Sequence, residues 1–207
     1  PMRGDLTGDL VAHTAYTDKV MKEIQPVSIE KDENGDYLVD FGVEISGRLR
    51  LNDVTGPEGH KIDIEYICNT YSGDNSYIFR GEGPENYASS FNWFVFSSVK
   101  IKNWPGELTP EMVTAEMVHT EIPETAVFET SNPLFNKINE IWRRSQVDNM
   151  HGGIASDCPH RERSAYTGDG QVACPTVMLN YDSRNFYYKW IADIREAQVK
   201  STGYVPN

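Results

Sequence analysis

Apolar and polar positions alternate along the first 127 residues of the chain with the two-residue period of β-strands. In the clearest segment, Lys61–Cys68, Ile62, Ile64 and Tyr66 share one face and charged residues occupy the other. The predicted strands are Tyr37–Val43, Arg48–Leu51, Lys61–Cys68, Tyr77–Arg80, Asn92–Lys102 and Val113–His119, with turns at Asn34-Gly35, Gly56-Pro57, Ser72-Gly73 and Pro105-Gly106. Several short strands separated by such turns indicate an antiparallel sandwich or barrel.

After residue 130 the apolar period changes to that of an α-helix. Ser131 or Asn132 suits the N-cap of a helix, and Pro133 suits its first position. An amphipathic helix is therefore predicted over residues 133–149, before the stop signal His151-Gly152-Gly153. Its apolar stripe consists of Leu134, Ile138, Ile141 and Trp142.

Two further helices are predicted over residues 170–180 and 183–200, and the second has the apolar stripe Phe186, Trp190, Ile191 and Ile194. We therefore expect an antiparallel β-sandwich domain over residues 1–127, followed by an α-helical segment over residues 128–207. Three helices that each carry one apolar face need more packing partners than this segment supplies. The helices are thus expected to begin a larger all-helical domain.

Charge and composition limit the classes of partner. The chain of 207 residues carries 19 basic and 31 acidic residues, for a net charge of −12. Nucleic acids and anionic membrane surfaces select basic patches, so we expect neither as a partner. The 3 cysteines are too few and too scattered to form a disulfide framework.

The densest polar chemistry lies at residues 156–171, between two predicted helices. Loops held by rigid elements commonly carry function, which makes this stretch the candidate site. Its polar residues include Asp157, His160, Arg161, Glu162, Arg163, Tyr166 and Asp169.

Glu162 stands between Arg161 and Arg163. Partial burial would raise the pKa of its carboxyl and suit it to general acid catalysis, whereas the neighbouring arginines would lower that pKa. Two interpretations therefore stay open from composition: a general acid, or a structural ion-pair network.

Metal or thiol chemistry is not favoured. Cys158, His160, Cys174 and His151 match no usual zinc-ligand spacing, and Pro159 stiffens the link between Cys158 and His160. We expect no metal and no cofactor.

The run Asp157-Cys-Pro-His-Arg-Glu-Arg-Ser-Ala-Tyr-Thr-Gly-Asp169 resembles the signature of the bacterial α-L-rhamnosidases of glycoside hydrolase family 78. In that family the signature opens an (α/α)6 barrel that follows a β-sandwich. Looser resemblances extend over residues 37–47, 91–101, 128–138, 189–198 and 203–207. The resemblance implies hydrolysis of terminal α-L-rhamnosyl residues with inversion.

The resemblance also implies a role for each motif residue. Glu162 matches the general acid, which protonates the leaving glycosidic oxygen. Asp157, Arg161 and Asp169 match residues that hold the sugar, and Tyr166 stands where many members have a tryptophan that walls the rhamnose pocket.

Two features of the chain depart from that pattern. An acid that many members insert before Glu162 is missing, and Ser164-Ala165 replaces the more usual Leu-Gly. The general base comes from a late part of the family's barrel, and no residue here matches it. We therefore expect residues 1–207 alone to be inactive and to need the remainder of the barrel as a partner.

Two other interpretations compete with the enzyme. The sandwich can be a carbohydrate-binding module that uses exposed aromatic residues, such as Tyr71, Trp93 or Trp104, although such residues more often belong to a core. Alternatively, the chain is a structural fragment with a degenerate site, in which Glu162 is ion-paired beside no pocket.

Overall fold

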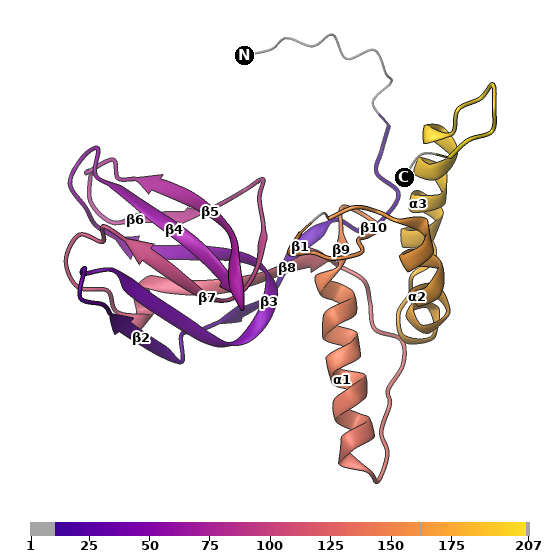
Figure 1. Ribbon diagram of the computed structural model, residues 1–207, viewed down its shortest axis with the longest axis horizontal. Helices are drawn as coiled ribbons and strands as arrows, with labels where there is room; N and C mark the ends of the chain where they lie inside the picture. The colour runs from indigo at the N-terminus through magenta and orange to yellow at the C-terminus, as the bar shows by residue number, and fades with distance from the viewer. Residues whose placement is uncertain (1–10, 162, 206–207) are drawn as a thin grey trace.

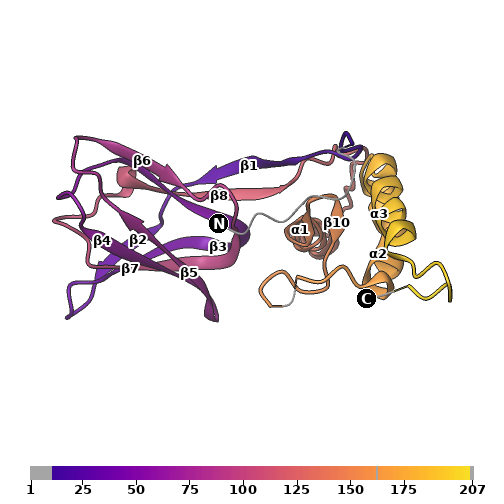
Figure 2. The ribbon, with the colours of Figure 1, turned by 90° about the horizontal axis from the view of Figure 1, so that it is seen from above.

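The computed structural model describes residues 11–161 and 163–205, and at residues 70 and 71 it describes the backbone alone. Most strands gather at one end of the molecule and the helices lie at the other (Figure 1). Viewed from above, β1 (Asp18–Ile24) and β8 (Val113–Thr120) run from the sheet toward the helices (Figure 2). None of the described helices combines the length and apolarity that a membrane span requires.

Strands β1 to β8 form one antiparallel sheet with the order β1-β8-β3-β7-β4-β5, and β2 and β6 pair with further parts of β3. Their bounds are β1 Asp18–Ile24, β2 Ser28–Lys31, β3 Tyr37–Val54, β4 Lys61–Cys68, β5 Thr70–Ile78, β6 Glu85–Ala88, β7 Phe94–Lys102 and β8 Val113–Thr120. This sandwich-like sheet confirms the predicted fold class for the first part of the chain.

β3 joins two of the predicted strands, Tyr37–Val43 and Arg48–Leu51, into one long strand. Its pairing with β7 shifts between Asp40 and Ile45, and Gly42 there has a φ of +69°. A left-handed residue lets a strand bend without ending. β3 can therefore pair with β2 near its start and with β6 and β8 near its end.

The prediction of a turn at Ser72-Gly73 was wrong. The chain reverses at Asn69, whose φ is +55°, and Gly73 lies inside β5 opposite Tyr66. A Cβ on Gly73 would lie 2.3 Å from the Phe94 ring, so the glycine permits close packing rather than a turn. The predicted strand Tyr77–Arg80 is the end of this longer strand, which stops at Ile78.

Three helices follow: α1 Pro133–Asp148, α2 Thr167–Asn180 and α3 Arg184–Ala197. Asn132 is the N-cap of α1, and its side chain accepts a hydrogen bond from Leu134 N at 3.0 Å. At the helix stop predicted from His151-Gly152-Gly153, between α1 and α2, the chain forms a small hairpin of β9 (Met150–His151) and β10 (Ile154–Ala155). A short 3₁₀ turn, Pro110–Met112, precedes β8.

Each helix leaves large apolar side chains uncovered in the described part of the chain. They include Leu134, Phe135, Ile138 and Ile141 of α1, Val172, Met178 and Leu179 of α2, and Tyr188 and Ile191 of α3. Buried apolar surface is what stabilises such helices in proteins. The exposed faces agree with the expectation that these helices belong to a larger helical domain.

The end of α1 is fastened to the sheet through a buried carboxylate. Ser46 N, in β3, donates a hydrogen bond of 2.8 Å to Asp148 Oδ1, and both residues are buried. Burial raises the pKa of Asp148 to about 6. The junction that precedes the candidate site therefore contains a carboxyl group that is costly to ionise.

We expect Asp148→Asn to stabilise the protein at pH 8 but not at pH 4. Folding raises the pKa of Asp148, so the neutral carboxyl group contributes favourably to the free energy of unfolding at low pH. This contribution is lost as pH rises from about 4 through 6. The amide keeps the acceptor for Ser46 N without ionising, so the gain at pH 8 should be about 2 kcal/mol. Urea unfolding of the complete protein across this pH range measures it, with the exposed Asp182→Asn as control. A pH-independent difference between wild type and Asp148→Asn would contradict this account.

Candidate functional site

The candidate site is built on the loop between β10 and α2. Asp157 and Ser164 close this loop with two hydrogen bonds: Asp157 N donates to Ser164 O at 3.0 Å, and Ser164 N donates to Asp157 Oδ1 at 3.2 Å. Cys158 Sγ donates a hydrogen bond of 3.2 Å to Asp157 Oδ2. Both carboxylate oxygens therefore accept a hydrogen bond from the loop, which orients Asp157.

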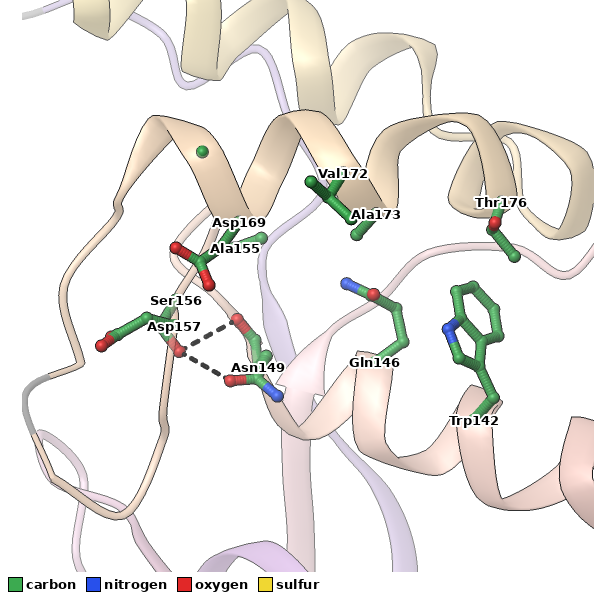
Figure 3. A pocket seen from close by; sticks show the side chains of 11 residues that line it. Trp142, Gln146, Asn149, Ala155, Ser156, Asp157, Asp169, Val172, Ala173 and Thr176 are labelled. Atoms are coloured by element: carbon green, nitrogen blue, oxygen red, sulfur yellow. Dashed lines mark hydrogen bonds between the residues drawn. The ribbon is translucent and has the colours of Figure 1, made fainter.

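A pocket of about 640 Å³ lies beside this loop, within the usual range of small-molecule sites. Asp157 and Asp169 lie at one end of it and Trp142 at the other (Figure 3). Ser156 Oγ donates to Asn149 Oδ1 at 3.2 Å on the pocket wall. The full lining is Trp142, Gln146, Asn149, Ala155, Ser156, Asp157, Gly168, Asp169, Val172, Ala173 and Thr176.

The structure brings two of the predicted sugar contacts together and leaves two others outside the lining. Asp157 and Asp169 share the pocket, and Asp169 is an exposed residue in the first turn of α2. Tyr166 is the half-buried N-cap residue of α2, and Arg161 is exposed; neither lines this pocket. Glu162 lies outside the described residues.

Several polar or aromatic residues of the pocket were not predicted from the sequence as site residues. Trp142, Gln146 and Asn149 come from the end of α1. Their spacing of four and then three residues places them on one face of that helix. The signal was present in the sequence, but Trp142 was interpreted as part of an apolar stripe.

Arg163 turns away from the pocket toward the sandwich. Its guanidinium carbon lies 4.2 Å from the centre of the Trp93 ring, and burial lowers its pKa from the usual value. The Trp93 ring in turn stacks on His151, with ring centres 3.7 Å apart and an 8° angle between planes.

The zinc ligands considered from the sequence do not meet in the described residues. His151 Nε2 lies 3.0 Å from Ser46 Oγ, and Cys158 contacts Asp157. Over residues 11–161 and 163–205, no three His, Cys, Asp or Glu side chains are grouped so that they could hold a metal ion.

Of the aromatic residues considered for glycan binding, Trp104 is buried and packs edge-to-face on Phe79 in the sandwich core. The side chain of Tyr71 lies outside the described residues. The ring of Trp93 is engaged by His151 and Arg163. These placements do not favour a stacking platform for sugars on the sandwich.

Two family models match consecutive parts of the chain. The bacterial α-L-rhamnosidase concanavalin-like domain matches residues 30–119, and the bacterial α-L-rhamnosidase 6 hairpin glycosidase domain matches residues 123–207. The chain belongs to the bacterial α-L-rhamnosidase family. Its helices lie in the part of the chain that matches the helical glycosidase domain, which confirms the second part of the predicted fold class.

Curated proteins named α-L-rhamnosidase are similar to this chain. An α-L-rhamnosidase of Formosa agariphila is 34% identical to this chain, and the match covers 90% of this chain and 21% of that protein. An α-L-rhamnosidase of Streptomyces avermitilis is 28% identical, and the match covers 97% of this chain and 21% of that protein. The chain thus spans about a fifth of the length of these curated relatives.

Solved structures show the same architecture. The α-L-rhamnosidase from Dictyoglumus thermophilum superimposes with a TM-score of 0.85 at 30% identity, over 93% of this chain and 23% of that one. The Streptomyces avermitilis α-L-rhamnosidase complexed with L-rhamnose superimposes with a TM-score of 0.84 at 28% identity, over 96% of this chain and 21% of that one.

Proposed function

We propose that this chain is part of an inverting α-L-rhamnosidase that releases terminal α-L-rhamnosyl residues from glycans or glycosides. The observation that carries the proposal is the pocket that holds Asp157 and Asp169 beside the signature loop, in a chain that matches both family models. One solved relative, from Streptomyces avermitilis, is described as complexed with L-rhamnose, which supports rhamnose as the sugar.

Glu162 is the general acid of the proposed mechanism. It stands in the signature at the position of the family's acid, five residues after Asp157. Its carboxyl donates a proton to the glycosidic oxygen as the bond to the anomeric carbon breaks. A second carboxylate, roughly 6.5–9.5 Å from the first, activates the attacking water in an inverting enzyme. We assign that base to the remainder of the helical barrel.

The other motif residues bind the sugar in this proposal. The carboxylates of Asp157 and Asp169 accept hydrogen bonds from vicinal hydroxyls, and both line the pocket. Arg161 and Tyr166 do not line this pocket, and their roles rest on the resemblance to the family: Arg161 donates to the sugar oxygens, and the Tyr166 ring covers the methyl-bearing edge of the deoxy sugar. Residues 1–127 form the sandwich domain and residues 128–207 the first helices of the catalytic domain.

Turnover of 4-nitrophenyl α-L-rhamnoside by the complete protein tests the function. Proton NMR of the first product should show the β-anomer, because inversion places the new hydroxyl on the opposite face of the ring. Residues 1–207 alone should give no turnover, since they lack the base. Release of the α-anomer, or activity of residues 1–207 alone, would contradict the mechanism.

A further inference from the structure

A cluster of three side chains connects the sandwich to the signature loop. Trp93 directly precedes β7 of the sandwich, His151 belongs to β9, and Arg163 lies in the loop. The centre of the Trp93 ring lies 3.7 Å from the centre of the His151 ring and 4.2 Å from the Arg163 guanidinium carbon. We call these three residues the Trp93 cluster.

Two strands of the sandwich, β3 and β1, contact the His151 side chain of the Trp93 cluster. His151 is 8% exposed, with Nε2 3.0 Å from Ser46 Oγ and Nδ1 3.6 Å from Asp18 Oδ2. Asp18 Oδ1 also accepts a hydrogen bond of 2.9 Å from Gly152 N. Ser46 therefore holds the imidazole through Nε2 while the Asp18 carboxylate lies beside Nδ1, and Trp93 rests on a ring that is buried on both sides of this contact.

The other end of the cluster holds the loop. Arg163 has a φ of +55°, a conformation that a residue with a side chain keeps only when its surroundings enforce it. Arg163 Nε donates to Pro159 O at 3.1 Å, and Arg163 N donates to Cys158 O at 3.3 Å. The side chain thus ties the loop to itself while it stacks on Trp93.

A cation is attracted to the face of an aromatic ring, and the attraction is stronger where the site is partly desolvated. The contact is reinforced by Arg163 Nη1, which lies 3.4 Å from Asn92 Oδ1 in the segment that carries Trp93. Glu162 directly precedes Arg163 in the sequence, so a shift of the Arg163 backbone is passed to the residue that carries the acid.

We propose that Trp93, a residue of the β-sandwich, is a positioning residue for the general acid. Through Arg163 it holds the loop so that the proton of Glu162 reaches the glycosidic oxygen. The sandwich is then part of the catalytic machinery rather than a neighbour of it. The inference rests on the proposed function of Glu162.

The test uses the complete protein and two substrates that differ in their need for an acid. Phenyl α-L-rhamnoside has a poor leaving group that must be protonated, whereas the 2,4-dinitrophenolate ion leaves without a proton. We expect Trp93→Ala to lower kcat on the phenyl substrate about 10–100-fold, the effect of a small misplacement. On the dinitrophenyl substrate kcat should stay nearly unchanged, and KM should change little on either.

Three further variants sharpen the test. Trp93→Phe keeps an aromatic face and should restore most of the lost activity. Arg163→Lys keeps the charge but removes the planar group, and should show the same selective loss on the phenyl substrate even if Trp93→Ala does not fold. Phe91→Ala, an exposed aromatic residue in the same segment, should match wild type on both substrates.

The outcomes separate the inference from the function on which it rests. An equal loss on both substrates, or no loss, in Trp93→Ala or Arg163→Lys would overturn the positioning role. If Glu162→Gln shows the selective loss and the Trp93 and Arg163 variants do not, only the inference fails. If Glu162→Gln itself shows no selectivity, the assignment of the acid fails.

Discussion

Glu162→Gln should lower kcat of the complete protein on phenyl α-L-rhamnoside by about 10²–10⁴-fold, the range for loss of a general acid. Glutamine has nearly the shape of glutamate but no proton to give to the leaving oxygen. Proton transfer develops only in the transition state, so KM should change far less than kcat.

The leaving group supplies the internal check of this prediction. The loss should shrink strongly on 2,4-dinitrophenyl α-L-rhamnoside, whose leaving group needs no proton. Initial rates on the two substrates, measured for wild type and variant in one buffer, give the comparison. Glu129→Gln makes the same chemical change at an exposed residue before α1 and should behave as wild type. Equal losses on both substrates would mean that Glu162 is not the acid.

Local patterns predicted the elements whose side chains depend on near neighbours. Lys61–Cys68 is β4 with the predicted bounds, because its apolar residues alternate and face the core. Pro133 begins α1 as its cap signals indicate. β5 was mispredicted because the role of Gly73 is decided by Phe94, a residue of another strand that packs against it. No local pattern records such a contact.

The candidate site, too, could be predicted only in part from the sequence. The signature stretch could be found from its composition and its resemblance to the family, and the structure places Asp157 and Asp169 at one pocket. The contribution of the sandwich could not be found. Asn92 and Arg163 are 71 residues apart in sequence, and only the fold brings their segments into contact. A single aromatic residue before a strand gives no sign of such a partner.

Gly170, the last glycine of the signature stretch, shows how packing shapes the motif. It is a buried residue of α2, and a Cβ at this position would lie 1.9 Å from Trp190 Cη2 and 2.2 Å from Cζ3. Trp190 in α3 is 5% exposed, so its ring has little room to move aside. The glycine therefore lets α2 and α3 approach each other directly behind Asp169.

We expect Gly170→Ala to destabilise the complete protein by about 3 kcal/mol, at the upper end of the usual cost of overpacking. Alanine favours a helix over glycine by about 1 kcal/mol, so the sign of the effect separates packing from helix propensity. Gly168→Ala is the matched control, because it lies two residues earlier in the same helix and its Cβ would meet no atom within 4 Å. Thermal unfolding should show a lower Tm for Gly170→Ala and an unchanged or slightly higher Tm for Gly168→Ala. A Tm for Gly170→Ala equal to that of the control would mean that α3 yields to the added methyl group, and that the glycine is not required for packing.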